Sequence, residues 1–108
     1  MRELLVYKFY FWDFYNEQTE EVREKIDYVL DVVINHNRIP KQFFKHIEGT
    51  DGLYEIRIKL GTNIYRIFCC FDKGNLVILF NAFQKKDQKL PKDEIKRALK
   101  LKSEYEKK

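Results

Sequence analysis

The sequence predicts an α+β domain in which helices lie on one face of an antiparallel sheet. Three consecutive runs rich in β-branched and aromatic residues, separated by short turns, lie within residues 53–86. Segments with helical periodicity lie on either side, at 16–35 and 91–105. The expected order is an N-terminal strand, two helices, a three-stranded antiparallel meander and a C-terminal helix.

Length and composition fit one packed domain spanning residues 1–108. The chain is 44% hydrophobic and 16% aromatic, which is typical of a globular protein. No apolar run reaches the length needed to span a membrane, and the charged first eight residues do not resemble a signal peptide. We therefore expect a cytoplasmic protein.

The N-terminal half is predicted to hold one strand and then a helix. Leu4 to Trp12 is the first strand candidate, and its aromatic end runs into the helical region. Asn16 or Thr19 can cap the following helix, which should end near residues 35–37. Its apolar residues recur at i, i+4, i+7, i+8, i+11 and i+12 and form one stripe: Val22, Ile26, Val29, Leu30, Val33 and Ile34.

A second, short helix is predicted after Pro40. Proline is favoured at the first helical position, so the segment through Phe43, Phe44 and His46 is expected to be helical. Residues 49–52 then form the loop into the sheet.

The three strands of the meander are predicted at residues 53–59, 63–71 and 76–83. Because side chains alternate along a strand, Glu55, Arg57 and Lys59 share one face of the first strand. Arg66 interrupts the apolar second strand, where a guanidinium group is costly unless it is paired or reaches a wet cleft. This arrangement is the first indication of a functional site.

The two cysteines, Cys69 and Cys70, are adjacent in the second strand and should point to opposite faces. Such a pair cannot supply a tetrahedral metal site. We expect both to be small buried hydrophobic residues with free thiols, as in a reducing compartment.

The last helix is predicted from Pro91 to Tyr105, with acidic residues in its first turn and lysines near its end. Two inner edges fit its periodicity, and the sequence leaves both open: Ile95, Leu99 and Lys102, or Ala98, Leu101 and Tyr105.

The two halves of the chain carry opposite charge. Residues 1–51 hold seven Lys and Arg against ten Asp and Glu, a net −3, whereas residues 52–108 hold fourteen against seven, a net +7. A basic half with interspersed aromatics suits a polyanion such as RNA. A solvated, lysine-rich surface would give the same count.

Several catalytic classes find no support in the sequence, which has no metal-ligand spacing, phosphate-binding glycine loop or nucleophile elbow. His36 and His46 are expected to be surface or cap residues. Glu55 is the only acidic residue on the charged strand face, which argues against a pair of catalytic carboxylates.

What remains is a group of cations on the predicted sheet. If the strands pair as a meander, Arg57, Lys59, Arg66, Lys85 and Lys86 can converge on one face. Such a group can hold a phosphodiester and stabilise its pentacovalent transition state, with the 2′-hydroxyl of the RNA as nucleophile and no metal or cofactor. Alternatively, Arg57 pairs with Glu55 or with an acidic helix, and the lysines are only solvated.

Three segments carry a resemblance to a known family: residues 52–57, residues 64–72, and residues 83–95 with the sequence Phe-Gln-Lys-Lys-Asp-Gln-Lys-Leu-Pro-Lys-Asp-Glu-Ile. Together with residues 45–52 and the last helix, they resemble the RelE/ParE toxin superfamily, and more narrowly its HigB-like, phage-derived Gp49-like branch. The resemblance extends over about the whole chain.

The resemblance implies a RelE-like microbial RNase fold and the toxin of a type II toxin–antitoxin system. Such a toxin is a ribosome-dependent mRNA endonuclease that inhibits translation, leaving a cyclic phosphate and a 5′-hydroxyl. Its expected partners are the ribosome with its mRNA and a cognate antitoxin, often of the helix-turn-helix type, in an oligomeric complex.

The resemblance also implies roles for individual residues. Arg66 matches the family's phosphate-binding arginine, Arg57 lies on a basic strand position, and Lys85 and Lys86 match the basic pair after the last strand. These four are the expected catalytic residues. The residues expected to contact RNA are Lys59, Tyr65, Phe83, Gln88 and Lys89.

The general base is left open. Some relatives use a C-terminal tyrosine or a histidine, and neither stands at the matching place, so a lysine with a lowered pKa or Glu55 is expected to act. Two other functions also stay open: a ParE-like gyrase inhibitor on the same fold, and a non-catalytic module that binds RNA or protein. Arg66→Ala is expected to abolish toxicity and leave the fold intact.

Overall fold

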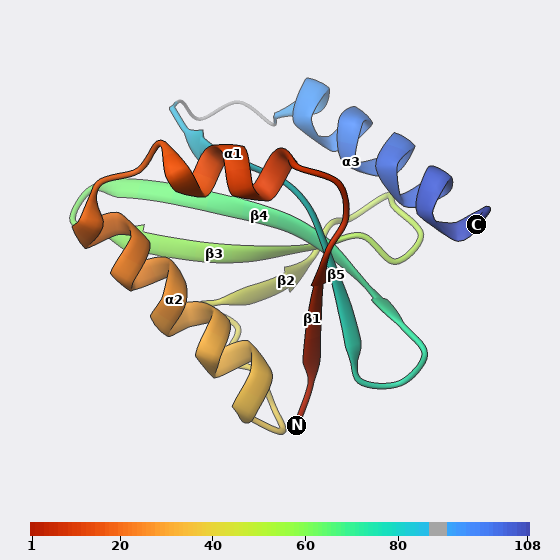
Figure 1. Ribbon diagram of the computed structural model, residues 1–108, viewed down its shortest axis with the longest axis horizontal. Helices are drawn as coiled ribbons and strands as arrows, with labels where there is room; N and C mark the ends of the chain where they lie inside the picture. Colours follow the sequence, from red (N-terminus) through yellow and green to blue (C-terminus); the bar gives the residue numbers. More distant parts are fainter. Residues whose placement is uncertain (87–90) are drawn as a thin grey trace.

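The computed structural model describes residues 1–86 and 91–108. It contains a five-stranded sheet in the order β1-β5-β4-β3-β2, together with three helices (Figure 1). In chain order the elements are β1 (Glu3–Val6), α1 (Tyr10–Asn16), α2 (Glu20–Asn35), β2 (Phe44–His46), β3 (Tyr54–Leu60), β4 (Asn63–Asp72), β5 (Leu76–Lys85) and α3 (Lys92–Glu106).

The sheet is mixed. The predicted meander is confirmed, since β3, β4 and β5 pair antiparallel in succession. The short strand β2 adds antiparallel to β3, and β1 pairs parallel with β5 at the other edge. In the register of β3 with β4, Glu55 lies opposite Phe68 and Arg57 lies opposite Arg66. The charged positions of the two strands therefore share one face.

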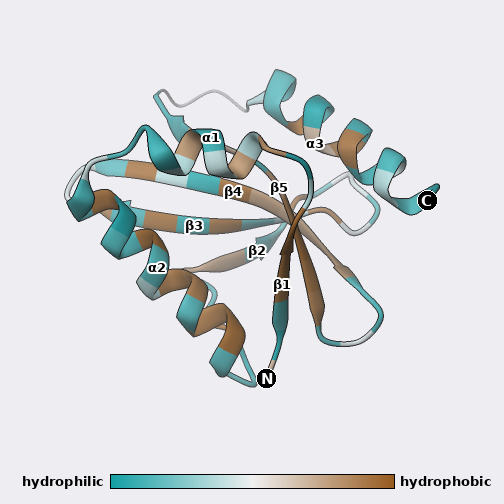
Figure 2. Ribbon diagram, viewed as in Figure 1, coloured by the Kyte–Doolittle hydropathy of each residue, from teal (hydrophilic) through white to brown (hydrophobic). Residues whose placement is uncertain are grey.

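Helices cover both faces of the sheet, so the expectation that they lie on one face is wrong. The core on one face joins α2 to residues such as Ile56 and Ile67, while the core on the other joins α3 to Phe68 and Phe80. In Figure 2 the strands are largely hydrophobic, whereas the helices alternate between hydrophobic and hydrophilic stretches, as helices with one buried side do. Among the described residues, no helix is long and apolar enough to cross a membrane.

The predicted helix before the sheet is confirmed as α2. Thr19 is its N-cap, and its hydroxyl oxygen accepts a hydrogen bond from the backbone N–H of Val22 at 3.3 Å. His36 is its C-cap, as expected for a surface or cap residue. Four members of the predicted stripe are buried, Val22, Ile26, Val29 and Val33, together with Val32, which the predicted stripe does not include. Leu30 and Ile34 are half-buried.

The first strand is shorter than predicted. β1 ends at Val6, Lys8 adopts a positive φ of 61°, and the aromatic run that follows forms α1. Phe11 is 1% exposed and lies in the core beneath α2, with Phe14 packed against the same core. An unbroken aromatic run fits a period of 2 and a period of 3.6 equally well, and tertiary packing decides between them.

The short helix predicted after Pro40 is a turn and a strand. The N–H of Phe43 donates to the carbonyl of Pro40 at 2.9 Å, and the chain then extends into β2. Phe44 pairs with Ile56 of β3 and stacks on Tyr54 with ring centroids 5.0 Å apart. Pairing at the sheet edge outweighs the local preference of Pro40 for a helix start.

The C-terminal helix α3 settles the choice between its two possible inner edges. Ala98 and Leu101 are buried against the sheet, whereas Leu99 is 37% exposed. The hydroxyl of Tyr105 donates to Asp72 of β4 at 2.6 Å. The inner edge is therefore the one formed by Ala98, Leu101 and Tyr105.

The cysteines are placed as predicted. Both are free and buried, with Cys69 in the core under α2 and Cys70 in the core under α3.

Candidate functional site

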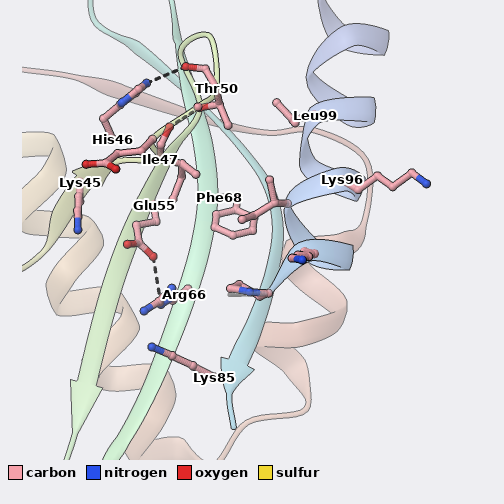
Figure 3. A pocket seen from close by; sticks show the side chains of 15 residues that line it. Lys45, His46, Ile47, Thr50, Glu55, Arg66, Phe68, Lys85, Lys96 and Leu99 are labelled. Carbon is pink, nitrogen blue, oxygen red and sulfur yellow. Dashed lines mark hydrogen bonds and ion pairs between the residues drawn. The ribbon is translucent and has the colours of Figure 1, made fainter. Parts of the chain in front are cut away.

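A cavity of about 850 Å³ opens between the sheet, the loop joining β2 to β3, and the first half of α3 (Figure 3). We call it the cationic cavity. Glu55, Arg66, Phe68 and Lys85 form its floor on β3, β4 and β5. The remaining lining residues come from β2, its loop and α3: Lys45, His46, Ile47, Glu48, Gly49, Thr50, Pro91, Lys92, Ile95, Lys96 and Leu99.

Arg66 pairs with Glu55 at the floor of the cationic cavity. The Nε of Arg66 lies 3.1 Å from Oε2 of Glu55, and the two side chains are 11% and 6% exposed. The N–H is not directed at the carboxylate, so the contact is an ion pair rather than a hydrogen bond. Arg66 thus meets both conditions that the sequence set for it, since it is paired and also lines a cleft.

Arg57 adds a second guanidinium beside this pair. It lies directly opposite Arg66 in the β3–β4 register, and its buried Nε has no hydrogen-bond partner among the described residues. Like charges directly opposite one another on a sheet destabilise it. Glu55 pairs with Arg66, and no ion pair of Arg57 is found among the described residues, so this part of the sheet carries an excess of positive charge.

The lining of the cationic cavity is positive on balance. Five of its residues are Lys or Arg and two are Glu. Lys85 extends from β5 toward Arg66, as Figure 3 shows. The other cations are Lys45 on β2 and two lysines one turn apart on α3, Lys92 and Lys96. The side chain of Lys96 points away from the sheet in Figure 3, so the positive charge inside the cavity is concentrated where Arg66 and Lys85 meet, a geometry that suits a phosphate group.

The N-terminus of α3 also faces the cationic cavity. Pro91 is the N-cap and makes no side-chain capping hydrogen bond, and both Pro91 and Lys92 line the cavity. The first N–H groups of a helix lack intrahelical partners and carry the positive end of the helix dipole. This end of α3 therefore adds to the positive potential.

His46 is the one described histidine that lines the cationic cavity. Its Nε2 lies 3.1 Å from the carbonyl oxygen of Thr50. A carbonyl oxygen only accepts hydrogen bonds, so Nε2 is the donor in this contact. The sequence predicts a surface or cap residue in a helix, and the structure instead places His46 on β2 at the rim of the cavity.

The predicted catalytic residues are only partly brought together. Arg66 and Lys85 line the cationic cavity. Arg57 lies beside Arg66 on the same sheet face, while Lys59 and Lys86 are exposed and lie outside the lining. The alternative in which Arg57 pairs with Glu55 is wrong, because Glu55 pairs with Arg66.

Two of the residues expected to contact RNA lie elsewhere. Tyr65 is 5% exposed in the core beneath α2, on the opposite face from Arg66, so its expected role is wrong. The ring of Phe83 packs 5.3 Å from that of Phe68 and lines a different cavity. Gln88 and Lys89 lie outside the described residues.

Sequence reasoning misses several lining residues. It places His46 and Lys45 in a helix, and it gives Lys92 and Lys96 no role beyond that of ordinary residues of α3. The spacing of Lys92 and Lys96, four residues apart in a helix, is an available signal that both lie on one helix face. No local signal places Lys45 beside Glu55, because that proximity arises from the pairing of β2 with β3.

The fold is similar to that of a RelE toxin. The chain is similar to a chain of the crystal structure of the RelB–RelE antitoxin–toxin complex from Methanococcus jannaschii, with a TM-score of 0.54 and 22% sequence identity. The match covers 73% of this chain and 87% of that one. This likeness establishes the fold.

The family follows from the sequence match. Residues 13–103 match the model of the phage derived protein Gp49-like family (DUF891), and the chain belongs to this family, which is of the RelE/HigB toxin type. No curated protein matches the chain.

Proposed function

We propose that the protein is the toxin of a toxin–antitoxin pair and acts as an endoribonuclease that cuts ribosome-bound mRNA in the cytoplasm. The observation that carries the proposal is the convergence of Arg66 and Lys85 in the cationic cavity, beside the unpaired Nε of Arg57. Glu55 pairs with Arg66, which leaves the charge of Arg57, directly opposite Arg66, without a carboxylate partner among the described residues. A phosphodiester supplies the missing negative charge.

The chemistry needs no nucleophile from the protein. The 2′-oxygen of the RNA attacks the adjacent phosphorus and the bond to the 5′-oxygen breaks, which gives a 2′,3′-cyclic phosphate and a 5′-hydroxyl. Arg66 and Lys85 hold the phosphate and stabilise the extra negative charge of the pentacovalent transition state. The stabilisation that these two cations provide is largest in the transition state, because the charge on the phosphate oxygens is greatest there.

We do not assign the general base to His46, because His46 pairs with Tyr54 of β3 and packs against its ring, on the sheet face opposite Arg66. Glu55 is poorly suited to the role, since it is 5% exposed and paired with Arg66. The base that takes the proton of the 2′-hydroxyl is therefore left open. The leaving 5′-oxygen takes up a proton, which the ammonium group of Lys85 can supply.

The test is cleavage of an mRNA held on the ribosome, compared with the same mRNA free in solution. We expect cleavage of the ribosome-bound form and products with a cyclic phosphate at the 3′ end. An otherwise identical mRNA with one 2′-deoxynucleotide at the cleaved position should stay intact. Cleavage of that deoxy substrate would contradict the mechanism, and inhibition of gyrase supercoiling without mRNA cleavage would favour the ParE-like alternative.

A protein antitoxin is part of the proposal. The similar solved structure is of an antitoxin–toxin complex, and this chain belongs to a toxin family. We expect the product of a neighbouring small open reading frame to bind this chain, to cover part of its basic surface and to suppress cleavage. Binding that leaves cleavage unchanged would contradict this part of the proposal.

A further inference from the structure

A second cavity, of about 440 Å³, lies between α1, the last part of β5 and the first turns of α3. We call it the acidic cavity. It shares no lining residue with the cationic cavity. Nothing in the proposed cleavage reaction uses it.

The charge of the acidic cavity is opposite to that of the cationic cavity. Three carboxylates line it, those of Asp13, Glu17 and Glu94, against one guanidinium, that of Arg97. This negative site belongs to a chain with a net charge of +4. The ligand that it favours is a cation.

A buried amide gives a second, independent indication of a ligand. Asn81 on β5 is 2% exposed and lines the acidic cavity. Its Nδ2 donates to the backbone carbonyl and to Oε1 of Glu94, both at 3.0 Å, which ties α3 to the sheet. Its Oδ1 accepts no hydrogen bond among the described residues. Buried polar atoms almost always have a partner, so an additional hydrogen-bond donor is expected here.

Aromatic rings form the remaining wall. The guanidinium of Arg97 already lies 5.5 Å from the ring centroid of Tyr10, and Phe9 stacks on Tyr10 with centroids 4.5 Å apart. A planar guanidinium group stacks well on such rings, whereas an ammonium group is a point charge with a strong hydration shell. The acidic cavity thus combines the carboxylates, the carbonyl oxygen and the aromatic faces that a guanidinium group uses.

The rim of the acidic cavity carries an exposed apolar ring. Phe9 lines the cavity and is 56% exposed, whereas the exposed Trp12 on α1 is not among the lining residues. A large exposed side chain at the edge of a concave site marks a place where a protein segment can dock.

We propose that the acidic cavity binds an arginine side chain of the antitoxin, with an apolar neighbour of that arginine packed on Phe9. The guanidinium donates to Asp13, Glu17 and the free Oδ1 of Asn81. This inference rests on the proposed function for the existence of the partner, and it adds the site and the chemistry of its recognition.

The test titrates the isotope-labelled full chain with arginine amide and follows the backbone amide resonances. We expect saturable shifts centred on Asn81, Phe83 and Arg97. Citrulline amide has nearly the same shape without the charge and should bind at least about tenfold more weakly, because charge-assisted hydrogen bonds are about twice as strong as neutral ones. Lysine amide should also bind more weakly, since its ammonium group cannot stack or form a fork.

Variants that remove carboxylates inside and outside the acidic cavity test whether arginine amide binds there. Asp13→Asn combined with Glu17→Gln should weaken arginine amide binding, whereas Glu20→Gln on α2, outside the acidic cavity, should not. All three positions are exposed, so the fold should tolerate these changes. Absence of saturable shifts, equal affinity for citrulline or lysine amide, or unchanged binding by the double variant would overturn the proposal.

The proposed arginine site and the proposed nuclease activity can be disproved independently of each other. The double variant Asp13→Asn, Glu17→Gln should cleave ribosome-bound mRNA at the wild-type rate, because neither residue lines the cationic cavity. If no cleavage is seen with any form of the chain, the arginine site is still tested by the titration. If the chain cleaves mRNA but the titration shows no binding of arginine amide, only the proposal of the arginine site is contradicted.

Discussion

Arg66 and Glu55 show how a single residue environment links stability to function. The pair is almost fully buried at the floor of the cationic cavity. Burying two charges is tolerated only when each compensates the other, so the carboxylate of Glu55 is what allows a guanidinium at this position. The same pairing holds Arg66 in place before any phosphate arrives, which is the preorganisation that catalysis by charge requires.

This pairing changes what mutation of Arg66 should do. Arg66→Gln leaves the buried carboxylate of Glu55 without its ion-pair partner, so we expect unfolding in urea to show a loss of about 3–5 kcal/mol. The double variant Glu55→Gln, Arg66→Gln removes both charges and should recover most of that loss. Neither variant should cleave mRNA. The sequence alone predicted that loss of Arg66 leaves the fold intact, and wild-type stability of Arg66→Gln would support that view against ours.

The cysteines give a second prediction at this scale. Burial raises the pKa of the Cys69 thiol well above its usual value and that of the Cys70 thiol to about 11. At neutral pH both are therefore protonated, and they are 0% and 2% exposed. A thiol reagent should label neither in the native protein and both after unfolding in guanidinium chloride. Rapid labelling of one thiol in the native state would contradict this placement.

Elements are predicted well where the sequence pattern has one period and poorly where it has two. The stripe of α2 fits only a helix and the alternation of β3 fits only a strand, and both elements are found where these patterns lie. The run of aromatics before Asp13 has no single period, and its helix α1 is set by the packing of Phe11 into the core. Strand β2 is likewise set by its pairing with β3, which a local pattern cannot reveal.

The attachment of α3 to β4 predicts a pH dependence of stability. The hydrogen bond that Tyr105 donates to Asp72, together with burial, raises the pKa of the tyrosine from 10.0 to about 12. A raised pKa in the folded state means that this contribution is complete below pH 10 and is lost as the pH rises through about 12. The free energy of unfolding should therefore fall over this range more in the wild type than in Tyr105→Phe. Parallel pH profiles of the two proteins would show that the hydrogen bond does not tether the helix.

At the scale of the whole molecule, the fold class could be predicted and the site only in part. The order of strands and helices follows largely from the sequence, and so does the shared face of Arg57 and Arg66. The cationic cavity could not be predicted, because it forms between elements distant in sequence: β2 with its loop, the sheet, and α3. Arg66 and Lys92 come to line one cavity only after the chain has folded.

The arrangement of the two cavities suggests how one small domain serves two partners. The cationic cavity gathers positive charge from the sheet, the β2–β3 loop and α3, while the acidic cavity gathers negative charge from α1 and α3. Helix α3 contributes to both, with Lys92 and Lys96 in one and Glu94 and Arg97 in the other. A partner protein in the acidic cavity would thus lie against the same helix that borders the proposed RNA site.

The most direct test of the cationic cavity compares two lysine variants in cleavage of ribosome-bound mRNA. Lys85→Gln removes a charge at the floor of the cavity, whereas Lys100→Gln removes one from the exposed surface of α3, outside its lining. We expect the rate constant of Lys85→Gln to fall by about 100-fold, the size of effect seen when one group that stabilises a transition-state charge is lost. Lys100→Gln should cleave at the wild-type rate, and equal rates for Lys85→Gln and the wild type would contradict the assignment of this cavity as the site of cleavage.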